Sequence, residues 1–123
     1  MKLSATEETL MHHLWSRERG FMKDLLDAYD DPKPAATTVA TLLKRMTDKG
    51  LIAYREYGNS REYYPLVTRQ AYFATHVNGL VKKFFNNSAA QFASFFTTQA
   101  DLSTEELESL QKIIEEQLRK KKL

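Results

Sequence analysis

The hydrophobic period of the chain changes at Gly50, and this change limits the folds that the sequence can adopt. Before Gly50, apolar residues recur at the i, i+3, i+4, i+7 spacing of a helix with one buried face: Val39, Leu42, Leu43 and Met46. After it, residues 51–66 are rich in Ile, Tyr and Val and are interrupted by Gly58-Asn59-Ser60, which is typical of a β-hairpin. We therefore expect a helix over 35–49 and a hairpin with strands over 51–57 and 61–66. Pro65 is expected at the end of an edge strand, where its missing N–H is tolerated.

Two shorter helical patterns precede this pair of elements. Ser4 and Glu7 have the spacing of a capping box, which predicts the start of a first helix. Its apolar stripe consists of Leu10, Met11, Leu14 and Trp15. We expect Gly20 to end this helix in the left-handed conformation. A second helix is expected over 22–29, and the prolines of 31–34 then break the chain.

After residue 69 the sequence indicates only helices. A long amphipathic helix is followed by the break Asn86-Asn87-Ser88, a short apolar helix over 89–96 and a last helix with a capping box from Ser103 to Glu106. Three helices and a hairpin over about 65 residues describe a winged helix. The sequence therefore predicts a mainly α (α+β) fold with a winged helix-turn-helix domain at 1–68 and a helical dimerisation region at 69–123.

Charge and composition narrow the classes of function. The net charge is only +2, but residues 1–31 hold four basic and seven acidic side chains, whereas 33–62 hold six basic and three acidic ones. This local excess of positive charge suggests a polyanionic partner. No apolar run approaches the roughly 20 residues that span a bilayer, and the N-terminus lacks an apolar signal core. Cysteine is absent, which excludes disulfides and thiolate chemistry. We expect a cytoplasmic protein.

The outward face of the helix over 35–49 has the residue types of a DNA-reading surface. Threonine offers a hydroxyl to bases or phosphate and a methyl to thymine, and lysine or arginine reaches phosphate or a guanine edge. Arg61, beside the hairpin turn, is the wing candidate, with Arg55 second. The predicted DNA-binding residues are Thr37, Thr38, Thr41, Lys44, Arg45 and Arg61. The alternatives are an ordinary solvated face and cross-strand ion pairs of the two arginines with Glu56 or Glu62.

The C-terminal helices carry more apolar surface than a lone helical tail can bury, so we expect a second copy of the chain to cover it. The predicted dimer interface contains Phe73, Val77, Leu80, Val81, Phe84, Phe92, Phe95, Phe96, Leu110 and Ile114. In the alternative arrangement, these helices fold back onto their own winged helix.

Four segments together resemble the BlaI/MecI penicillinase-repressor family, which includes CopY-type repressors: LSATEETLMHHLW, TTVATLLKRMTDKGLI, REYYPLV and DLSTEELESL. The resemblance runs in order along nearly the whole chain. It implies a dimeric winged-helix repressor of a palindromic operator in double-stranded DNA, with Thr37, Thr38, Thr41 and Arg45 on the reading helix and Arg61 on the wing. In the family's best-known members a membrane sensor metalloprotease cleaves the C-terminal part and releases the operator.

The chain departs from the family pattern at three places. Ala35-Ala36 stands where members commonly have Ser-Pro, and Ala40 stands where many have arginine, which removes a contact to DNA. The cleaved Asn-Phe bond of the family falls on Phe95-Phe96. Copper sensing through C-terminal cysteines, as in CopY-type members, is excluded because there is no cysteine.

Other chemistry has little support in the sequence. His12 and His13 are adjacent and point in different directions on a helix, and His76 is isolated, so we expect no metal site. No base stands beside the acidic pairs, and no glycine-rich phosphate loop is present, so we expect neither catalysis nor a cofactor. The competing hypothesis is a winged helix used only for protein–protein interaction, without DNA binding. It would favour aromatic or aliphatic residues at Thr37, Thr41 and Lys44.

Overall fold

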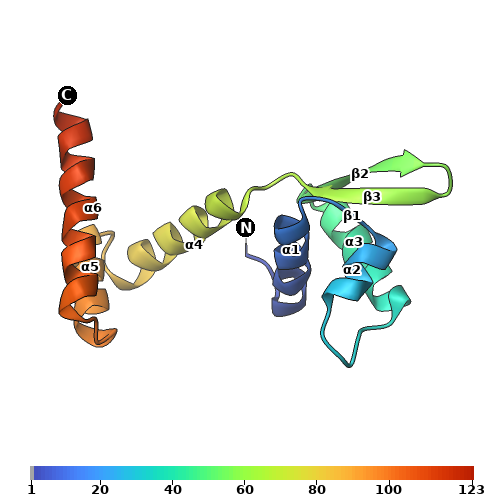
Figure 1. The fold of residues 1–123 in the computed structure, drawn as a ribbon, viewed down its shortest axis with the longest axis horizontal. Coiled ribbons are helices and arrows are strands. Elements are labelled where there is room, and N and C mark those ends of the chain that lie inside the picture. Colours follow the sequence, from blue (N-terminus) through green and yellow to red (C-terminus); the bar gives the residue numbers. More distant parts are fainter. Residues whose placement is uncertain (1) are drawn as a thin grey trace. The chain divides into compact units, whose positions relative to one another are not determined.

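The computed structural model describes residues 2–123 and divides the chain into two compact units, Met1–Val77 and Asn78–Leu123 (Figure 1). The elements follow in the order α1 (Ala5–Arg17), β1 (Gly20–Phe21), α2 (Met22–Ala28), α3 (Ala36–Asp48), β2 (Ile52–Tyr57), β3 (Ser60–Pro65), α4 (Arg69–Phe84), α5 (Ala89–Gln99) and α6 (Thr104–Lys122). Three helices followed by a hairpin confirm the predicted winged helix in the first unit.

The sheet has three antiparallel strands in the order β1-β3-β2. The hairpin register pairs Ile52 with Pro65 and Tyr57 with Ser60, so Gly58 and Asn59 make the turn. Gly58 has a φ of 62°, which suits glycine in a two-residue hairpin turn. The strand β1 was not expected from the sequence, and it makes β3 the central strand.

The predicted end of the first helix is wrong in its last turn. The helix α1 ends at Arg17, and Glu18 rather than Gly20 takes the positive φ, at 69°. Gly20 lies instead in β1 and pairs with Tyr63. A Cβ atom on Gly20 would lie 3.3 Å from a methyl carbon of Leu25, so the glycine allows α2 to pack closely behind β1.

Pro65 is not at an edge strand, because β3 lies between β1 and β2. The backbone N–H of Leu66 donates to the Leu51 carbonyl oxygen at 2.9 Å. In an antiparallel pair the backbone N–H groups of successive residues point to opposite sides of the strand. The N–H position of residue 65 therefore points away from β2, and no hydrogen bond to β2 is lost when a proline stands there. On its other side, β1 pairs only with Glu62 and Tyr63. Pro65 is tolerated because the third strand stops before reaching it.

The core of the first unit joins one face of α1 to one face of α3. The side chains of Leu10, Met11 and Leu14 on α1 are fully buried, as are those of Val39, Leu43 and Met46 on α3. Leu25 of α2 and Ile52 of β2 complete the same cluster. The expected apolar stripes are confirmed, and Gly50, with a φ of 77°, turns the chain from α3 into β2 as predicted.

The first unit also includes the beginning of α4. Tyr72 is buried, accepts a hydrogen bond from the Leu3 N–H at 3.4 Å, and donates one to Glu8 at 3.1 Å. The indole N–H of Trp15 donates to the Val67 carbonyl oxygen at 2.8 Å. The compact unit Met1–Val77 therefore includes the first turns of α4.

In the second unit the predicted break after α4 and the predicted capping box of α6 are present, and a serine also caps α5. Asn86 and Asn87 both have positive φ, and their turn separates α4 from α5. Ser88 caps α5, and Ser103 with Glu106 forms the capping box of α6. The helix α5 extends to Gln99, beyond the expected 89–96.

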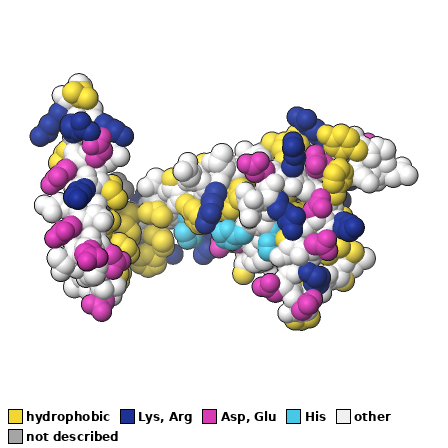
Figure 2. Space-filling view, in the orientation of Figure 1, with side chains coloured by type: hydrophobic (Ala, Val, Ile, Leu, Met, Phe, Trp, Pro, Cys, Tyr) yellow, Lys and Arg dark blue, Asp and Glu magenta, His cyan; other side chains and the backbone are white. Residues whose placement is uncertain are grey.

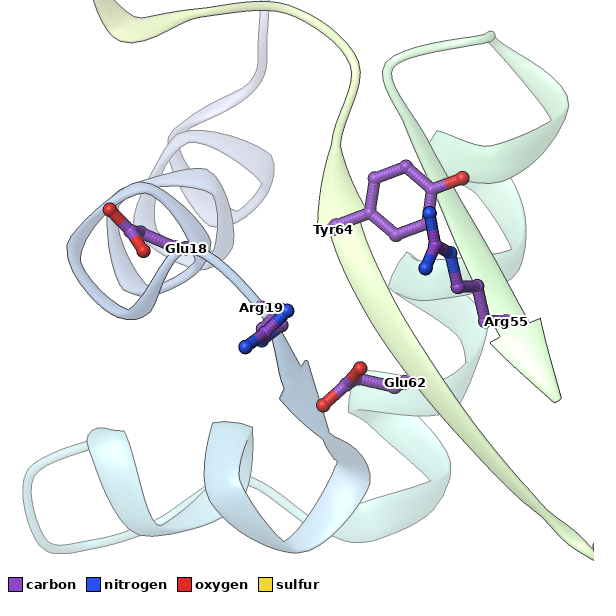
Figure 3. Close-up of a pocket in the computed structure, with 5 residues that line it drawn as sticks. All are labelled: Glu18, Arg19, Arg55, Glu62 and Tyr64. Carbon is purple, nitrogen blue, oxygen red and sulfur yellow. The ribbon is translucent and has the colours of Figure 1, made fainter. Parts of the chain in front are cut away.

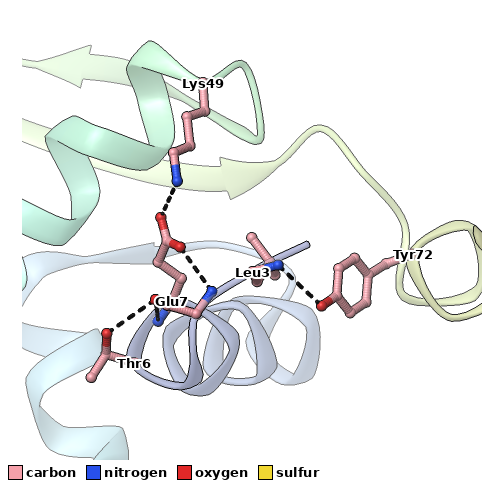
Figure 4. Close-up of polar contacts among 6 residues, drawn as sticks. Leu3, Thr6, Glu7, Lys49 and Tyr72 are labelled. Atoms are coloured by element: carbon pink, nitrogen blue, oxygen red, sulfur yellow. Dashed lines mark hydrogen bonds and ion pairs between the residues drawn. The ribbon is translucent and has the colours of Figure 1, made fainter. Parts of the chain in front are cut away.

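A carboxylate in the core links α1 to the end of α3 (Figure 4). Glu7 is 2% exposed; one of its oxygens accepts the Ser4 N–H at 2.9 Å, and the other accepts Lys49 Nζ at 2.8 Å. The Lys49 ammonium, together with the backbone N–H of Ser4, lowers the pKa of Glu7 to about 2. The expected capping box is confirmed, and the same side chain also holds the C-terminal end of α3.

We expect the Glu7 carboxylate to make stability pH-dependent. Because its folded-state pKa is lowered from 4.5 to about 2, its contribution is fully present above about pH 4.5 and is lost as the pH falls towards 2. Glu7→Gln should cost about 1–3 kcal/mol of unfolding free energy at pH 7 and little at pH 2, measured by urea unfolding. Glu108→Gln, at an exposed position of α6, is the control; an equal loss in both variants would contradict this assignment.

Candidate nucleic-acid interface

The helix α3 has one buried and one exposed face. Val39, Leu42, Leu43 and Met46 are buried, whereas all five predicted DNA-binding residues of this helix are exposed: Thr37, Thr38, Thr41, Lys44 and Arg45. Burial of the apolar face fixes the direction of the polar one, because a helix cannot rotate without exposing its core residues. The structure therefore places these five residues on the outer surface of one rigid helix.

Local contacts hold part of this surface in place. Thr41 Oγ1 donates to the Thr37 carbonyl oxygen at 3.0 Å, so its methyl group and hydroxyl have a defined direction. Lys44 Nζ lies 3.1 Å from Asp48 Oδ2, in a pair that is well exposed on both sides. Such a pair contributes little, so Lys44 can exchange Asp48 for another anion.

The N-terminus of α3 lacks a side-chain cap. Ala35 stands at the N-cap position, where its carbonyl oxygen accepts the Thr38 N–H at 3.0 Å but its side chain has no oxygen, whereas serine side chains cap α1, α5 and α6. The N–H groups of the first turn of a helix have no acceptor within the helix and carry partial positive charge. The beginning of α3 is thus suited to an anion such as a DNA phosphate.

A groove of about 330 Å³ beside α3 is lined by a residue from outside the helix. Thr38, Thr41, Leu42 and Arg45 form it together with Thr6 from the first turn of α1. No local pattern in the sequence indicates Thr6, because its approach to α3 depends on the packing of the two helices. The exposed Thr/Arg surface therefore continues from α3 onto α1.

The hairpin has two different faces, because side chains alternate along each strand. Tyr54 of β2 is in register with Tyr63 of β3, and Glu56 is in register with Arg61, so these four share one face. A groove of about 470 Å³ lies between this face and α3 and is lined by Ala40, Lys44, Thr47, Asp48, Tyr54, Arg61 and Tyr63. The structure thus brings the wing arginine and a lysine of α3 to the same groove.

Arg61 makes both an ionic and an aromatic contact on this face. Its guanidinium carbon lies 4.4 Å from the centre of the Tyr54 ring, and Nε lies 3.9 Å from Glu56. The pairing with Glu56 was one of the expected alternatives. Tyr63 and Tyr54 raise the pKa of Arg61, so the side chain remains a cation at all ordinary pH values.

Arg55 lies on the opposite face of the hairpin, away from the α3 groove. It borders a pocket of about 290 Å³ with Glu18, Arg19, Glu62 and Tyr64 (Figure 3). The guanidinium lies 5.8 Å from the centre of the Tyr64 ring. Figure 3 shows Glu62 pointing towards the segment that holds Arg19. Both signs of charge line this pocket, so its electrostatics do not favour a polyanion.

The histidines take separate roles in the first unit. His12 lies 3.9 Å from Glu8, while His13 packs its ring edge-on against Tyr29 at 4.5 Å. Burial lowers the pKa of His13, which favours the neutral imidazole. Over residues 2–123 no group of three or more His, Asp or Glu side chains is placed to hold a metal ion. Within the same range no helix is both long and apolar enough to cross a bilayer.

Apolar side chains of the second unit stay at the surface of the single chain. Phe84 is 64% exposed and Ile114 58%, and neither α5 nor α6 has a buried residue. Figure 2 shows hydrophobic side chains gathered over α5 and the end of α4, and basic ones at the C-terminal end of α6. Among the predicted interface residues, those exposed in the chain are Phe73, Val77, Leu80, Phe84, Phe95, Phe96 and Ile114, whereas Val81, Phe92 and Leu110 are half-buried.

The model of one protein family, described as penicillinase repressor, matches residues 3–116. The chain belongs to the penicillinase repressor family. Its class is therefore that of a DNA-binding, winged-helix transcriptional repressor. No curated protein gives a significant match to the sequence.

Two solved structures are similar to the chain in fold comparison. BpsR of Bordetella bronchiseptica, from a study of how 6-hydroxynicotinic acid regulates its DNA binding, has 15% identity and a TM-score of 0.48, with 96% of this chain and 76% of that chain covered. The oxidised form of MarR from E. coli has 14% identity and a TM-score of 0.47, with 95% and 76% covered.

Substitutions on the two faces of α3 should differ in their effect on the free energy of unfolding. Leu43→Ala should cost about 2–5 kcal/mol of unfolding free energy, because it leaves a cavity in the core. Arg45→Ala, two positions away on the exposed face, should change stability by less than about 0.5 kcal/mol. Thermal and urea unfolding of both variants measure this contrast. Equal destabilisation would show that the outward face of α3 is also part of a packed interface.

Proposed function

We propose that the chain represses transcription as a homodimer that binds a palindromic operator, with residues 1–68 as the DNA-binding domain and 69–123 as the dimerisation domain. The observation that carries this proposal is the groove between α3 and the hairpin, which Lys44 of the exposed α3 face and the wing arginine Arg61 line together. A reading helix and a wing that meet in this way match the shape of a duplex, in which the major groove is bordered by phosphates.

Each predicted contact has a distinct task in this arrangement. Thr37, Thr38 and Thr41 are short enough to let the α3 backbone approach base edges, and their methyl groups suit thymine. Lys44, Arg45 and Arg61 neutralise phosphates or read guanine. Ala40 lies among them without a polar group, so this repressor contacts fewer bases than relatives with arginine there. We infer that its operator differs from theirs at that base pair.

The exposed apolar side chains of the second unit support the homodimer. Exposed apolar side chains on α4, α5 and α6 are costly to leave in water, and a second copy related by a two-fold axis would cover them with the same residues. A two-fold dimer then presents two copies of α3 to half-sites one helical turn of DNA, or a multiple of it, apart.

Proteolytic release of the operator is a further part of the proposal. The Phe95-Phe96 bond, which corresponds to the family's cleaved bond, lies in α5, and both side chains are exposed. Cleavage there would divide the proposed dimer surface and leave the winged helix intact. A membrane metalloprotease encoded beside this gene, and cleavage of the chain by it at this bond, would support this route of induction.

DNA binding is tested by titrating a labelled duplex from the region upstream of the gene, at several salt concentrations. The wild type should bind it more tightly than an unrelated duplex, and log K should fall linearly with log salt. Arg45→Ala should weaken binding by about 1–3 kcal/mol. The matched control is Arg55→Ala, an exposed arginine on the opposite face of the hairpin, which should change affinity little. Absence of a salt-dependent complex would instead favour a protein–protein interaction module.

The dimer is tested by replacing one exposed apolar residue of α6 with a charged one. Ile114→Glu should shift the protein towards monomer in analytical ultracentrifugation and weaken operator binding, because it places a charge in the apolar interface. Leu66→Glu is the control, since Leu66 is similarly exposed but lies next to the hairpin. A wild-type monomer, or an unchanged mass for Ile114→Glu, would contradict the interface.

A further inference from the structure

The wing arginine is already oriented on the face of the hairpin that meets α3. A cation within about 6 Å of a ring centre is attracted to the ring face, and the guanidinium carbon of Arg61 lies 4.4 Å from the centre of Tyr54. Tyr63, which is in register with Tyr54, packs its ring 5.5 Å away. The Tyr54 ring therefore lies beneath the guanidinium group, and the Tyr63 ring supports it from the side.

The ion pair with Glu56 is the weaker of the two contacts. The side chains of Arg61 and Glu56 are more than half exposed, and the closest N–O distance is 3.9 Å. Salt screens an exposed pair of this kind, and its two long side chains lose rotamer freedom when they are held together. The Tyr54 ring is half-buried and fixed in the sheet, so it determines where the guanidinium lies.

Arg61 and Lys44 stand on opposite walls of the groove between the hairpin and α3. Ala40 contributes only a methyl group to the lining of this groove. Asp48, the remaining charged residue of the lining, pairs with Lys44 at 3.1 Å in an exposed contact. In the free protein, Asp48 and Glu56 are therefore weakly held partners of Lys44 and Arg61. A more strongly bound anion can replace either carboxylate. A chain of phosphates supplies such anions at regular spacing.

We propose that Tyr54 is a positioning residue for DNA binding: its ring holds Arg61 over the groove, so that Arg61 from the wing and Lys44 from α3 bind the same stretch of phosphate backbone. This inference rests on the proposed function. It assigns to Tyr54 a role through Arg61 rather than a contact of its own with DNA. It also predicts that Arg61 contacts the DNA strand that lies beside α3, rather than DNA beyond the tip of the wing.

A double-mutant cycle on the full-length chain tests the role of Tyr54. The four proteins are the wild type, Tyr54→Ile, Arg61→Ala and the double variant, titrated with the upstream duplex by fluorescence anisotropy. Tyr54→Ile keeps a strand-favouring side chain but removes the ring. It should weaken binding about two- to fivefold for each protomer on the DNA when Arg61 is present. When Arg61 is absent, it should have no effect.

Two further variants separate positioning from a structural role. Tyr54→Phe keeps the ring and should bind like the wild type. Tyr64→Ile removes the ring that lies beneath Arg55 on the other face of the same hairpin, and it should also leave binding unchanged. Urea unfolding is measured for every variant, and Tyr54→Thr replaces Tyr54→Ile in the cycle if the latter is unfolded.

The shared phosphate stretch is tested by the salt dependence. Arg61→Ala and Lys44→Ala should each lower the slope of log K against log salt by about one per bound protomer. An unchanged slope for Lys44→Ala would overturn the shared contact. Equal weakening by Tyr54→Ile with and without Arg61, or wild-type affinity in its presence, would overturn the positioning role. If the wild type itself shows no salt-dependent binding, the proposed function fails rather than this inference.

Discussion

Burial of one face of α3 is the constraint on which the rest of the winged helix depends. Val39, Leu43 and Met46 pack fully buried in one cluster with the apolar stripe of α1. A helix that buries such a stripe has only one orientation about its axis, so the same packing that stabilises the unit also aims the threonines and Arg45 outward. The Lys49–Glu7 contact holds the end of that helix, and Gly50 turns the chain directly into the hairpin. Stability and the direction of the candidate interface therefore have a common cause.

The hairpin adds a second surface whose two faces differ in electrostatic character. On the α3 side, Arg61 and Lys44 border one groove, which Tyr54 and Tyr63 of the hairpin also line. On the other side, Arg19 and Arg55 lie among Glu18 and Glu62. This difference follows from the alternation of side chains along a strand, because the register assigns each arginine to one face. Only the face beside α3 combines positive charge with the outward strip of a helix.

Local sequence signals predicted the elements of this fold well. These signals are the serine capping boxes, the helical spacing of the α3 stripe and the change of period at Gly50. Each depends only on residues that are near neighbours in the chain, and the structural feature that each predicts is present. The strand β1 was missed because a strand of two residues has no period to detect, and Gly20 was therefore assigned to a helix end. That error also placed Pro65 at an edge strand. Contacts between distant segments could not be predicted from local patterns. The contact of Lys49 with Glu7, for example, joins residues 42 positions apart. Alternation along the hairpin would have placed Tyr54 with Arg61, had the turn been fixed at Gly58 and Asn59.

The central claim is that the outward strip of α3 and the adjacent face of the wing contact DNA together. An NMR titration of the isotope-labelled protein with the upstream duplex tests it most directly, because backbone amide shifts report contacts residue by residue. The account predicts the largest changes at Thr37, Thr41, Arg45 and Arg61, with small changes at Glu18 and Arg19. Changes concentrated around Glu18 and Arg19, with the amides of α3 unaffected, would contradict it.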